Sequence, residues 1–173
     1  MAKQVIQLGT PPTGVGGDTP RSANIKINSN FDELYAADLV NYKRANILGT
    51  VSQSGGVPTG AIIERGTNAN GDFIKFADGT MICWKVYTRS NVSFGPQGVV
   101  SFSATIGNEQ FPATFAAEPY QATTVEGVGI TLWVAFTWGT PGTMWAQANA
   151  VTGYNVTGPY TFVVRRYAVG RWF

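Results

Sequence analysis

The stretch GAIIERGTNANGDFIKFADGTMICW, residues 60–84, is the most informative part of this 173-residue chain. Two short apolar runs, 61–63 and 73–77, are joined by a segment rich in Gly and Asn, and Asp78-Gly79 then leads into a third run, 80–88. Asn-Gly and Asp-Gly supply the positive φ angles of tight hairpin turns. The stretch therefore predicts a three-stranded antiparallel meander.

The composition extends this prediction to most of the chain. Only 13% of the residues are charged, whereas 44% are hydrophobic, and 21 Gly and 9 Pro indicate many turns. Soluble domains usually carry about 25% charged residues. The low charge suggests that another chain covers part of the surface. The predicted fold class is mainly β, with a short N-terminal helical region followed by an antiparallel β-sandwich domain.

Strand signals recur at intervals of about ten residues after the meander, as in a β-sandwich. Residues 111–115 interrupt them as an irregular crossover anchored by Phe111 and Phe115. The predicted strands cover residues 98–104, 119–128, 129–138, 144–150, 154–156 and a last strand over 160–172 that is broken near Arg165-Arg166.

One helix is predicted before the β region. Thr19 is a plausible N-cap, and Pro20 suits the first helical position. An apolar stripe follows at helical spacing and ends at Asp38; it consists of Ala23, Ile27, Phe31 and Leu34. A lone helix of this length is marginal in water. The stripe is therefore buried by its own domain, or by two further copies or a docking partner, and the sequence leaves these alternatives open.

The predicted domain boundaries follow the change in composition. Residues 1–50 form an N-terminal helical region, and residues 51–59, VSQSGGVPT, read as a linker. Residues 60–173 form a C-terminal β-sandwich. No apolar stretch is long enough to span a bilayer, and no signal peptide opens the chain, so no membrane insertion is expected.

Charge is distributed unevenly along the chain. Between Ser90 and Val164 there is no Lys or Arg, and the only acids are Glu109, Glu118 and Glu126. Because binding to a phosphate backbone needs clustered basic residues, no nucleic-acid partner is expected. A surface of Thr, Asn, Gln, Gly and aromatic residues suits a neutral polar ligand. The alternative is a well-packed sandwich whose surface has no binding role.

Several classes of enzyme are excluded by the residue inventory. The chain has no His and one cysteine, Cys83, which reads as a small buried hydrophobe. His-dependent triads and His-metal sites are therefore absent, and no cofactor or metal is expected. Paired carboxylates could hydrolyse a polysaccharide, but nothing in the sequence places two of the available acids together. Those acids are Glu64, Asp72, Asp78, Glu109, Glu118 and Glu126.

Aromatic residues at strand ends are the candidate binding residues. Trp138 and Trp145 flank the turn at 139–142, and Tyr154-Asn155 follow in the next loop. An aromatic face can stack on the C–H face of a sugar ring. We therefore predict an exposed receptor-binding tip formed by Trp138, Trp145, Tyr154 and Asn155. Trp84 and Trp133 have apolar neighbours in their strands, which favours core positions for both.

Three segments carry a resemblance to the tail fibres of bacteriophages. Residues 17–35, GDTPRSANIKINSNFDELY, resemble an N-terminal element of many such fibres, and residues 60–84 resemble a stretch that precedes their tips. The ending, with Phe111-Pro112, Phe115, Pro119 and YAVGRW at 167–172, is similar to C-terminal fibre tips with an H-type-lectin-like fold.

This resemblance implies a homotrimeric, non-enzymatic receptor-binding protein of a phage or prophage tail, made in the cytoplasm of the bacterial host and carried in the virion. It implies that residues 1–50 are the tail-attachment and trimerising helical region, which binds tail or baseplate proteins. It implies that residues 60–173 are the β-sandwich receptor-binding tip, which adsorbs to a host glycan, lipopolysaccharide or pilus. The alternative is a purely structural tail or baseplate component. A polysaccharide-degrading tail enzyme is a further alternative that fits the short chain poorly.

Overall fold

The computed structural model describes residues 3–41, 43–107, 109–138, 143–156 and 159–173. The chain divides into two compact units, Met1–Arg44 and Ala45–Phe173. The predicted linker, residues 51–59, contains a small hairpin of two-residue strands, β1 (Gln53–Ser54) and β2 (Val57–Pro58). The domain boundaries drawn from the sequence stay a prediction.

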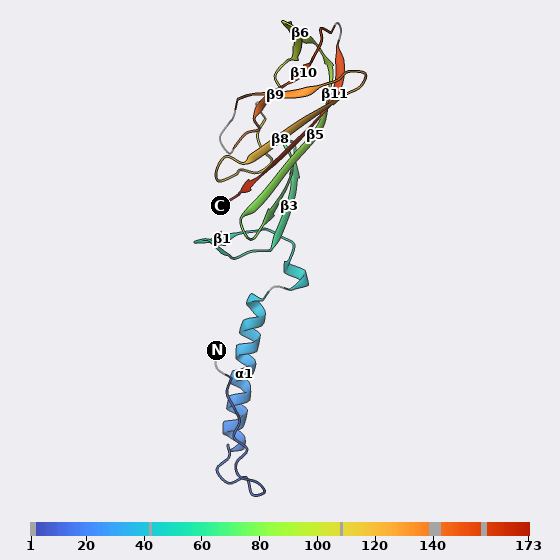
Figure 1. The fold of residues 1–173 in the computed structure, drawn as a ribbon. Helices are drawn as coiled ribbons and strands as arrows, with labels where there is room; N and C mark the ends of the chain where they lie inside the picture. The colour runs from blue at the N-terminus through green and yellow to red at the C-terminus, as the bar shows by residue number, and fades with distance from the viewer. Residues whose placement is uncertain (1–2, 42, 108, 139–142, 157–158) are drawn as a thin grey trace. The chain divides into compact units, whose positions relative to one another are not determined.

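The first unit is built on one helix, α1 (Pro20–Val40), drawn in blue in Figure 1. It begins as expected, because the Thr19 hydroxyl accepts a hydrogen bond from the backbone N–H of Ser22 at 3.1 Å and Pro20 occupies the first turn. Such a cap stabilises a helix by about 1 kcal/mol.

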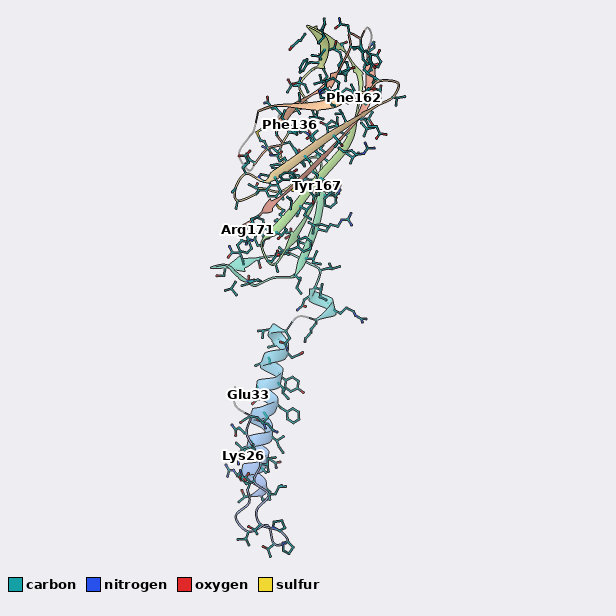
Figure 2. The ribbon with its side chains drawn as sticks, in the orientation of Figure 1. Lys26, Glu33, Phe136, Phe162, Tyr167 and Arg171 are labelled. Atoms are coloured by element: carbon teal, nitrogen blue, oxygen red, sulfur yellow. The ribbon has the colours of Figure 1, made fainter. Side chains whose placement is uncertain are left out.

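A row of polar side chains holds the preceding segment against α1. Lys26, labelled in Figure 2, forms an ion pair with Asp18 at 2.6 Å and donates to the Val5 carbonyl at 3.1 Å. Asn30 exchanges two hydrogen bonds of 2.9 Å with the backbone of Gln4. The polar face of the helix is therefore the face that is occupied within this unit.

A short 3-10 helix, η1 (Arg44–Asn46), spans the boundary between the two units, and the second unit contains two larger antiparallel sheets. The five-stranded sheet has the order β3-β4-β5-β11-β8, and the four-stranded sheet has the order β6-β7-β10-β9. Their strands are β3 (Ile63–Asn68), β4 (Gly71–Phe76), β5 (Thr80–Val92), β6 (Phe94–Gln97), β7 (Val100–Ser103), β8 (Tyr120–Gly127), β9 (Trp133–Trp138), β10 (Gln147–Thr152) and β11 (Tyr160–Arg171). This arrangement confirms the predicted fold class: mainly β, with one N-terminal helix followed by antiparallel sheets.

The meander predicted from residues 60–84 is confirmed as β3, β4 and the start of β5. Asn68 pairs with Gly71, so only Ala69 and Asn70 lie in the first turn, and both strands reach further into the Gly-Asn segment than expected. At the second turn Asp78 Oδ1 accepts from the N–H of Thr80 at 2.8 Å, and Gly79 has φ +94°. Asp78 and Gly79, the turn residues identified in the sequence, therefore determine the turn between β4 and β5.

The last strand differs from its prediction. β11 runs unbroken through Arg165-Arg166 and lies between β5 and β8. Figure 1 shows β5 and β11 as the two long strands at the centre of the sheet. The expected break is wrong because the two arginines simply alternate: Arg165 is exposed, whereas Arg166 is only 1% exposed and points into the core.

The four-stranded sheet contains one strand that the sequence did not indicate. β6 includes Gly95 and Pro96, which are poor strand formers, but it lies at the sheet edge, where a proline does not remove a needed ladder hydrogen bond. β9 begins four residues later than predicted, at Trp133, and the short strand expected at 154–156 is absent.

Two clusters of buried side chains fill the second unit. One joins strands of the five-stranded sheet to the crossover and contains Met81, Cys83, Phe111, Phe115, Trp145 and Ala168. The other joins the two sheets and contains Val92, Phe94, Ile106, Ala150, Phe162 and Val164. The expectation that Phe111 and Phe115 anchor the crossover and that Cys83 is a buried hydrophobe is confirmed, since each is at most 5% exposed.

Candidate functional site

The outer face of the four-stranded sheet follows from the alternation of side chains along β10. Ala150 lies in the cluster shared by the two sheets, so its neighbours Asn149 and Val151 point to the opposite face. Residues directly opposite in an antiparallel pair share a face. Val151 pairs with Phe102 on β7 and with Trp133 on β9, so these three side chains form a row across the outer face.

The row carries two aromatic residues. Trp133 is 44% exposed, and Phe102 is half-buried. Val151 between them is only 2% exposed, because a large side chain flanks it on each side. Trp133 was expected in the core, and that expectation is wrong: Leu132, its neighbour in the chain, is the residue that packs on the cluster between the sheets.

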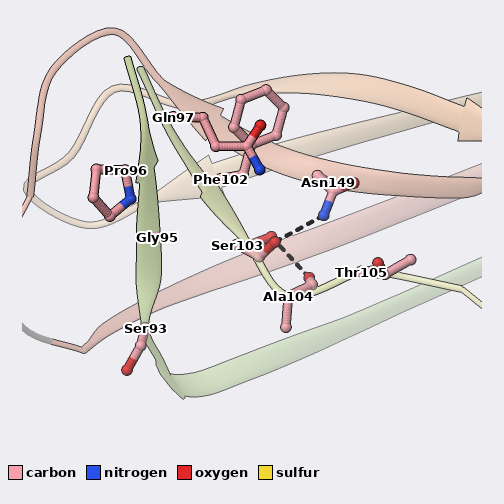
Figure 3. Close-up of a pocket in the computed structure, with 9 residues that line it drawn as sticks. All are labelled: Ser93, Gly95, Pro96, Gln97, Phe102, Ser103, Ala104, Thr105 and Asn149. Atoms are coloured by element: carbon pink, nitrogen blue, oxygen red, sulfur yellow. Dashed lines mark hydrogen bonds between the residues drawn. The ribbon is translucent and has the colours of Figure 1, made fainter. Parts of the chain in front are cut away.

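A hollow of about 450 Å³ lies at one end of this row, where Phe102 meets the edge strand β6. Its lining contains no charged residue and consists of Ser93, Gly95, Pro96, Gln97, Phe102, Ser103, Ala104, Thr105 and Asn149, as Figure 3 shows. Ser93, Gln97 and Thr105 are exposed there and offer hydroxyl and amide groups.

Asn149 is the fixed polar group of the hollow. Its Nδ2 donates to the Ser103 carbonyl at 2.7 Å, and the Ser103 hydroxyl accepts from the N–H of Ala150 at 3.0 Å and donates to the Ala104 carbonyl at 2.9 Å. The first and last of these bonds are drawn in Figure 3. These bonds hold the Asn149 amide in one orientation, which is what a recognition group requires.

The predicted binding residues divide between surface and core. Tyr154 is 49% exposed, and its hydroxyl accepts from the N–H of Thr131 at 3.5 Å. Asn155 is exposed, and its Oδ1 accepts from the Ser101 hydroxyl at 3.5 Å. The backbone of Trp138 pairs with Gln147, but its side chain lies outside the part of the chain that the structure describes.

The expected exposure of Trp145 is wrong. Its side chain is 1% exposed, its ring centroid lies 4.6 Å from that of Phe111, and the Arg166 guanidinium stacks 5.6 Å from it. A strand-end tryptophan beside a glycine-rich turn thus packs inward, because the crossover at Phe111 lies over it. Trp145 therefore belongs to the core and not to a surface site.

Trp133 takes the place next to Tyr154 that the sequence had given to Trp145. A Cβ placed on Gly153 would lie 3.3 Å from the Trp133 ring, so the residue just before Tyr154 contacts this tryptophan. The strand pattern contained the signal for this position, because Trp133 alternates with the apolar Leu132 and Val134. Neither Phe102 nor Asn149 was indicated by the sequence.

The outer face of the five-stranded sheet is a second candidate surface. Ile74, Ile82, Val169 and Tyr120 form one row across four strands of this sheet. Val86 is 60%, Tyr120 72% and Tyr167 42% exposed, and Tyr167 is labelled in Figure 2. We call this surface the apolar face; it comprises Ile74, Ile82, Trp84, Val86, Tyr120, Val163, Tyr167 and Val169. A hollow of about 690 Å³ beside Ile74 and Ile63 continues it toward Leu48.

The predicted attachment stripe on α1 is a third candidate surface. Phe31 and Leu34 are 52% and 64% exposed, whereas Ala23 and Ile27 are half-buried. No side chain of α1 is buried. Within the described residues, Phe31 and Leu34 are therefore the part of the stripe that its own unit leaves uncovered.

The described residues contain no group of three or more His, Cys, Asp or Glu side chains that could hold a metal ion. None of their helices combines the length and the apolar character needed to cross a membrane.

Comparisons with known proteins gave one structural likeness to report. No protein-family model matches the chain, and no curated protein matches it. Among solved structures, the N-truncated R1-type pyocin tail fibre is similar over 90% of this chain and 99% of its own, with 18% sequence identity and a TM-score of 0.41. At these values the likeness carries no argument about binding, which depends on the residues themselves.

Proposed function

We propose that this chain is a receptor-binding protein of a phage or phage-like tail, a non-enzymatic adhesin that mediates adsorption to a bacterial surface. The observation that carries the proposal is the uncharged, hollowed outer face of the four-stranded sheet, with Phe102, Trp133 and Asn149 on it. Exposed aromatic and amide groups on a rigid sheet suit recognition of glycans more than they suit catalysis. The tip domain would then be the H-type-lectin-like part that the sequence resemblance implies.

Assembly as a homotrimer is the second part of the proposal. The apolar face presents eight uncharged side chains, although Arg165 lies opposite Val86 and the side chains of Arg65, Asp72 and Glu126 lie on the same side of the sheet. Monomeric proteins rarely leave large apolar patches exposed. The stripe of Ala23, Ile27, Phe31 and Leu34 adds a second uncovered apolar surface. Both are accounted for if copies of the chain cover one another. Three identical tips would then gain avidity on a repetitive surface.

Attachment to tail or baseplate proteins is assigned to the N-terminal region, and the mature protein is placed in the virion. Support comes from the tail-fibre-like segment at residues 17–35, which forms the start of α1. The polar row of Asp18, Lys26 and Asn30 holds the preceding segment on the helix, so this unit offers a preformed element for docking.

A non-enzymatic role is supported by the contacts that acidic side chains make in the β unit. Glu109 forms ion pairs with Lys85 and Arg166, Glu126 with Arg165, and Glu64 with Lys75. Asp78 caps its turn. These carboxylates are engaged in structural contacts, which disfavours a polysaccharide-degrading pair. A purely structural tail component is the second candidate, favoured by the extent of the apolar face.

Adsorption of the full chain tests the proposal. The fluorescently labelled protein is incubated with a panel of bacterial strains that includes isogenic mutants lacking surface glycans. Selective binding to some strains, lost in their glycan mutants, is the expected result. Uniform absence of binding would favour the purely structural role. Native mass spectrometry of the same preparation should report a trimer, and a stable monomer would contradict the assembly.

A further inference from the structure

We propose that the hollow beside Phe102 and Asn149 is a saccharide subsite for a neutral pyranose residue, and that the bound glycan continues across the strands toward Trp133. This inference depends on the proposed receptor-binding function and names the ligand class and the residues that would recognise it.

The shape of the site is suited to a small ring. A volume of about 450 Å³ lies within the range of about 300–1,000 Å³ of small-molecule sites. Gly95 forms one wall, and a Cβ placed there would meet no atom within 4 Å. The missing side chain therefore leaves the hollow open on the side of the edge strand.

The chemistry of the lining matches a sugar. A pyranose has an apolar C–H face and a rim of hydroxyls. Phe102 provides an aromatic surface on which the C–H face can stack. The Asn149 amide has two donors and two acceptor positions, and the Ser103 carbonyl occupies one donor. The remaining positions, with the side chains of Ser93, Gln97 and Thr105, can bind hydroxyls.

The electrostatics favour a neutral sugar over an acidic one. None of the nine lining residues is charged. The nearest cation along the rim, Arg89, directs its Nη1 to the carbonyls of Ala104 and Thr105 at 3.3 and 3.2 Å. These bonds direct Nη1 to the backbone of the loop, so an anionic group in the hollow would find no cation among the lining residues.

The position of Trp133 extends the site beyond one ring. Phe102 and Trp133 lie on strands separated by β10, which places them two strand spacings apart, about 9.5 Å. A single pyranose does not reach both aromatic rings. We therefore expect a neutral oligosaccharide laid across the strands to bind more tightly than its monosaccharide.

The binding test uses defined probes. The methyl pyranosides of glucose, galactose, mannose, rhamnose and N-acetylglucosamine, and short oligosaccharides of each, are titrated into the isotopically labelled full chain at millimolar concentrations. At least one neutral probe should shift the amide resonances of residues 93–105 and 149. Failure of every neutral probe, or a response only to glucuronate and sugar phosphates, would overturn the proposal.

A filling variant locates the site. Gly95→Leu should weaken binding of the responding sugar at least tenfold, because its Cβ meets open space and the rest of the leucine side chain extends into the hollow. The control is Val99→Leu, on the same hairpin but 82% exposed and outside the lining; it should bind as the unchanged protein does. Equal binding by both variants would place the sugar elsewhere.

A second variant tests whether the glycan extends to Trp133. Trp133→Ala should reduce the advantage of the oligosaccharide over the monosaccharide and leave monosaccharide binding unchanged. An unaltered oligosaccharide advantage would show that the glycan does not cross the strands. Thermal unfolding of each variant checks that the fold is retained.

Cell adsorption separates failure of this site from failure of the proposed function. If Gly95→Leu adsorbs to the responsive strains as well as Val99→Leu does, the saccharide site is wrong and the adhesin role stands. If neither variant nor the unchanged protein adsorbs to any strain, the receptor-binding role itself is wrong.

Discussion

Arg166 brings a charge into the interior of the β unit. Its Nη2 donates to the carbonyls of Ile106 and Ala146 at 3.0 and 2.9 Å, and its Nη1 lies 3.6 Å from a carboxylate oxygen of Glu109. Burial lowers the pKa of this guanidinium, and its Nε has no hydrogen-bond partner among the described residues. Arg166 thus connects β11 to the segments at Ile106 and Ala146, which lie outside the strands of the two sheets.

Replacing Arg166 should destabilise the fold strongly. Arg166→Ala removes the buried donor to the Ile106 and Ala146 carbonyls and one of the two cations that pair with Glu109. Loss of buried hydrogen bonds from a charged group costs about 1.5–3 kcal/mol of unfolding free energy. Arg165→Ala, on the same strand, removes only the exposed pair with Glu126 and should cost about 0–1 kcal/mol. Urea denaturation measures both. Similar losses in the two variants would contradict the structural role of Arg166.

Cys83 should be chemically silent in the folded protein. Burial raises the pKa of its thiol to about 12, so the reactive thiolate is scarce at pH 8. A chromogenic disulfide reagent should label Cys83 only at the rate at which the protein opens, and at once in denaturant. Labelling should rise steeply only above about pH 10, where alkali unfolds the chain or ionises the thiol. Rapid labelling at pH 8 without denaturant would show that Cys83 is accessible.

For single residues, the sequence predicted membership of the core better than it predicted the direction in which a tryptophan side chain points. Cys83, Phe111 and Phe115 were correctly assigned to the core, because few other roles suit them. Trp133 and Trp145 were assigned the wrong way round. Both are large aromatic residues at strand ends, and only the pairing register and the path of the crossover decide which one is covered.

Among the elements, β5 and β11 carry the apolar face whose covering by other copies is proposed. Tyr120, on β8, is 72% exposed and lies in the uncharged row of Ile74, Ile82 and Val169. Tyr120→Glu would place a carboxylate in a dry interface, where an unpaired charge is costly. We expect dissociation into folded monomers, measured by light scattering and native mass spectrometry.

The control for this variant is Val99→Glu. Val99 is more exposed, at 82%, and lies on the turn between β6 and β7, away from the apolar face. This variant should remain a trimer. If Tyr120→Glu remains trimeric as well, the copies meet through another surface.

The sequence predicted strands correctly where clear turn residues bounded them, and it missed a strand at the edge of the four-stranded sheet. Asn70-Gly71 and Asp78-Gly79 specified the meander, and the Gly79 position requires its φ of +94°. β6 was missed because Gly95 and Pro96 argue against a strand unless the strand is known to lie at an edge. The break assigned to β11 came from two adjacent arginines whose opposite orientations follow only from the sheet.

On the scale of the whole chain, the two compact units should differ in their ability to fold alone. Both clusters of buried side chains lie within Ala45–Phe173, whereas α1 buries no side chain. Residues 45–173 expressed alone should therefore unfold cooperatively and keep the near-ultraviolet circular dichroism of their aromatic residues. Residues 1–44 alone should lose most of their helix. A disordered 45–173 fragment would contradict this prediction.

The sequence predicted the presence of a helical part and a β part, but not which surfaces remain uncovered. That knowledge needs the register of β7, β9 and β10, which brings Phe102, Val151 and Trp133 into one row. No local pattern in the sequence relates these three residues, since they come from segments far apart in the chain.

The position of β11 between β5 and β8 limits how early in synthesis the sheet can form. The ribosome makes this strand after every other strand of its sheet, and yet β5 and β8 do not touch without it. A nascent chain that lacks residues 160–171 exposes two strand edges and half of the core, which are the surfaces that promote aggregation. Folding of the β unit is therefore completed only after this last strand has left the ribosome, and premature stop codons that remove it would yield insoluble protein.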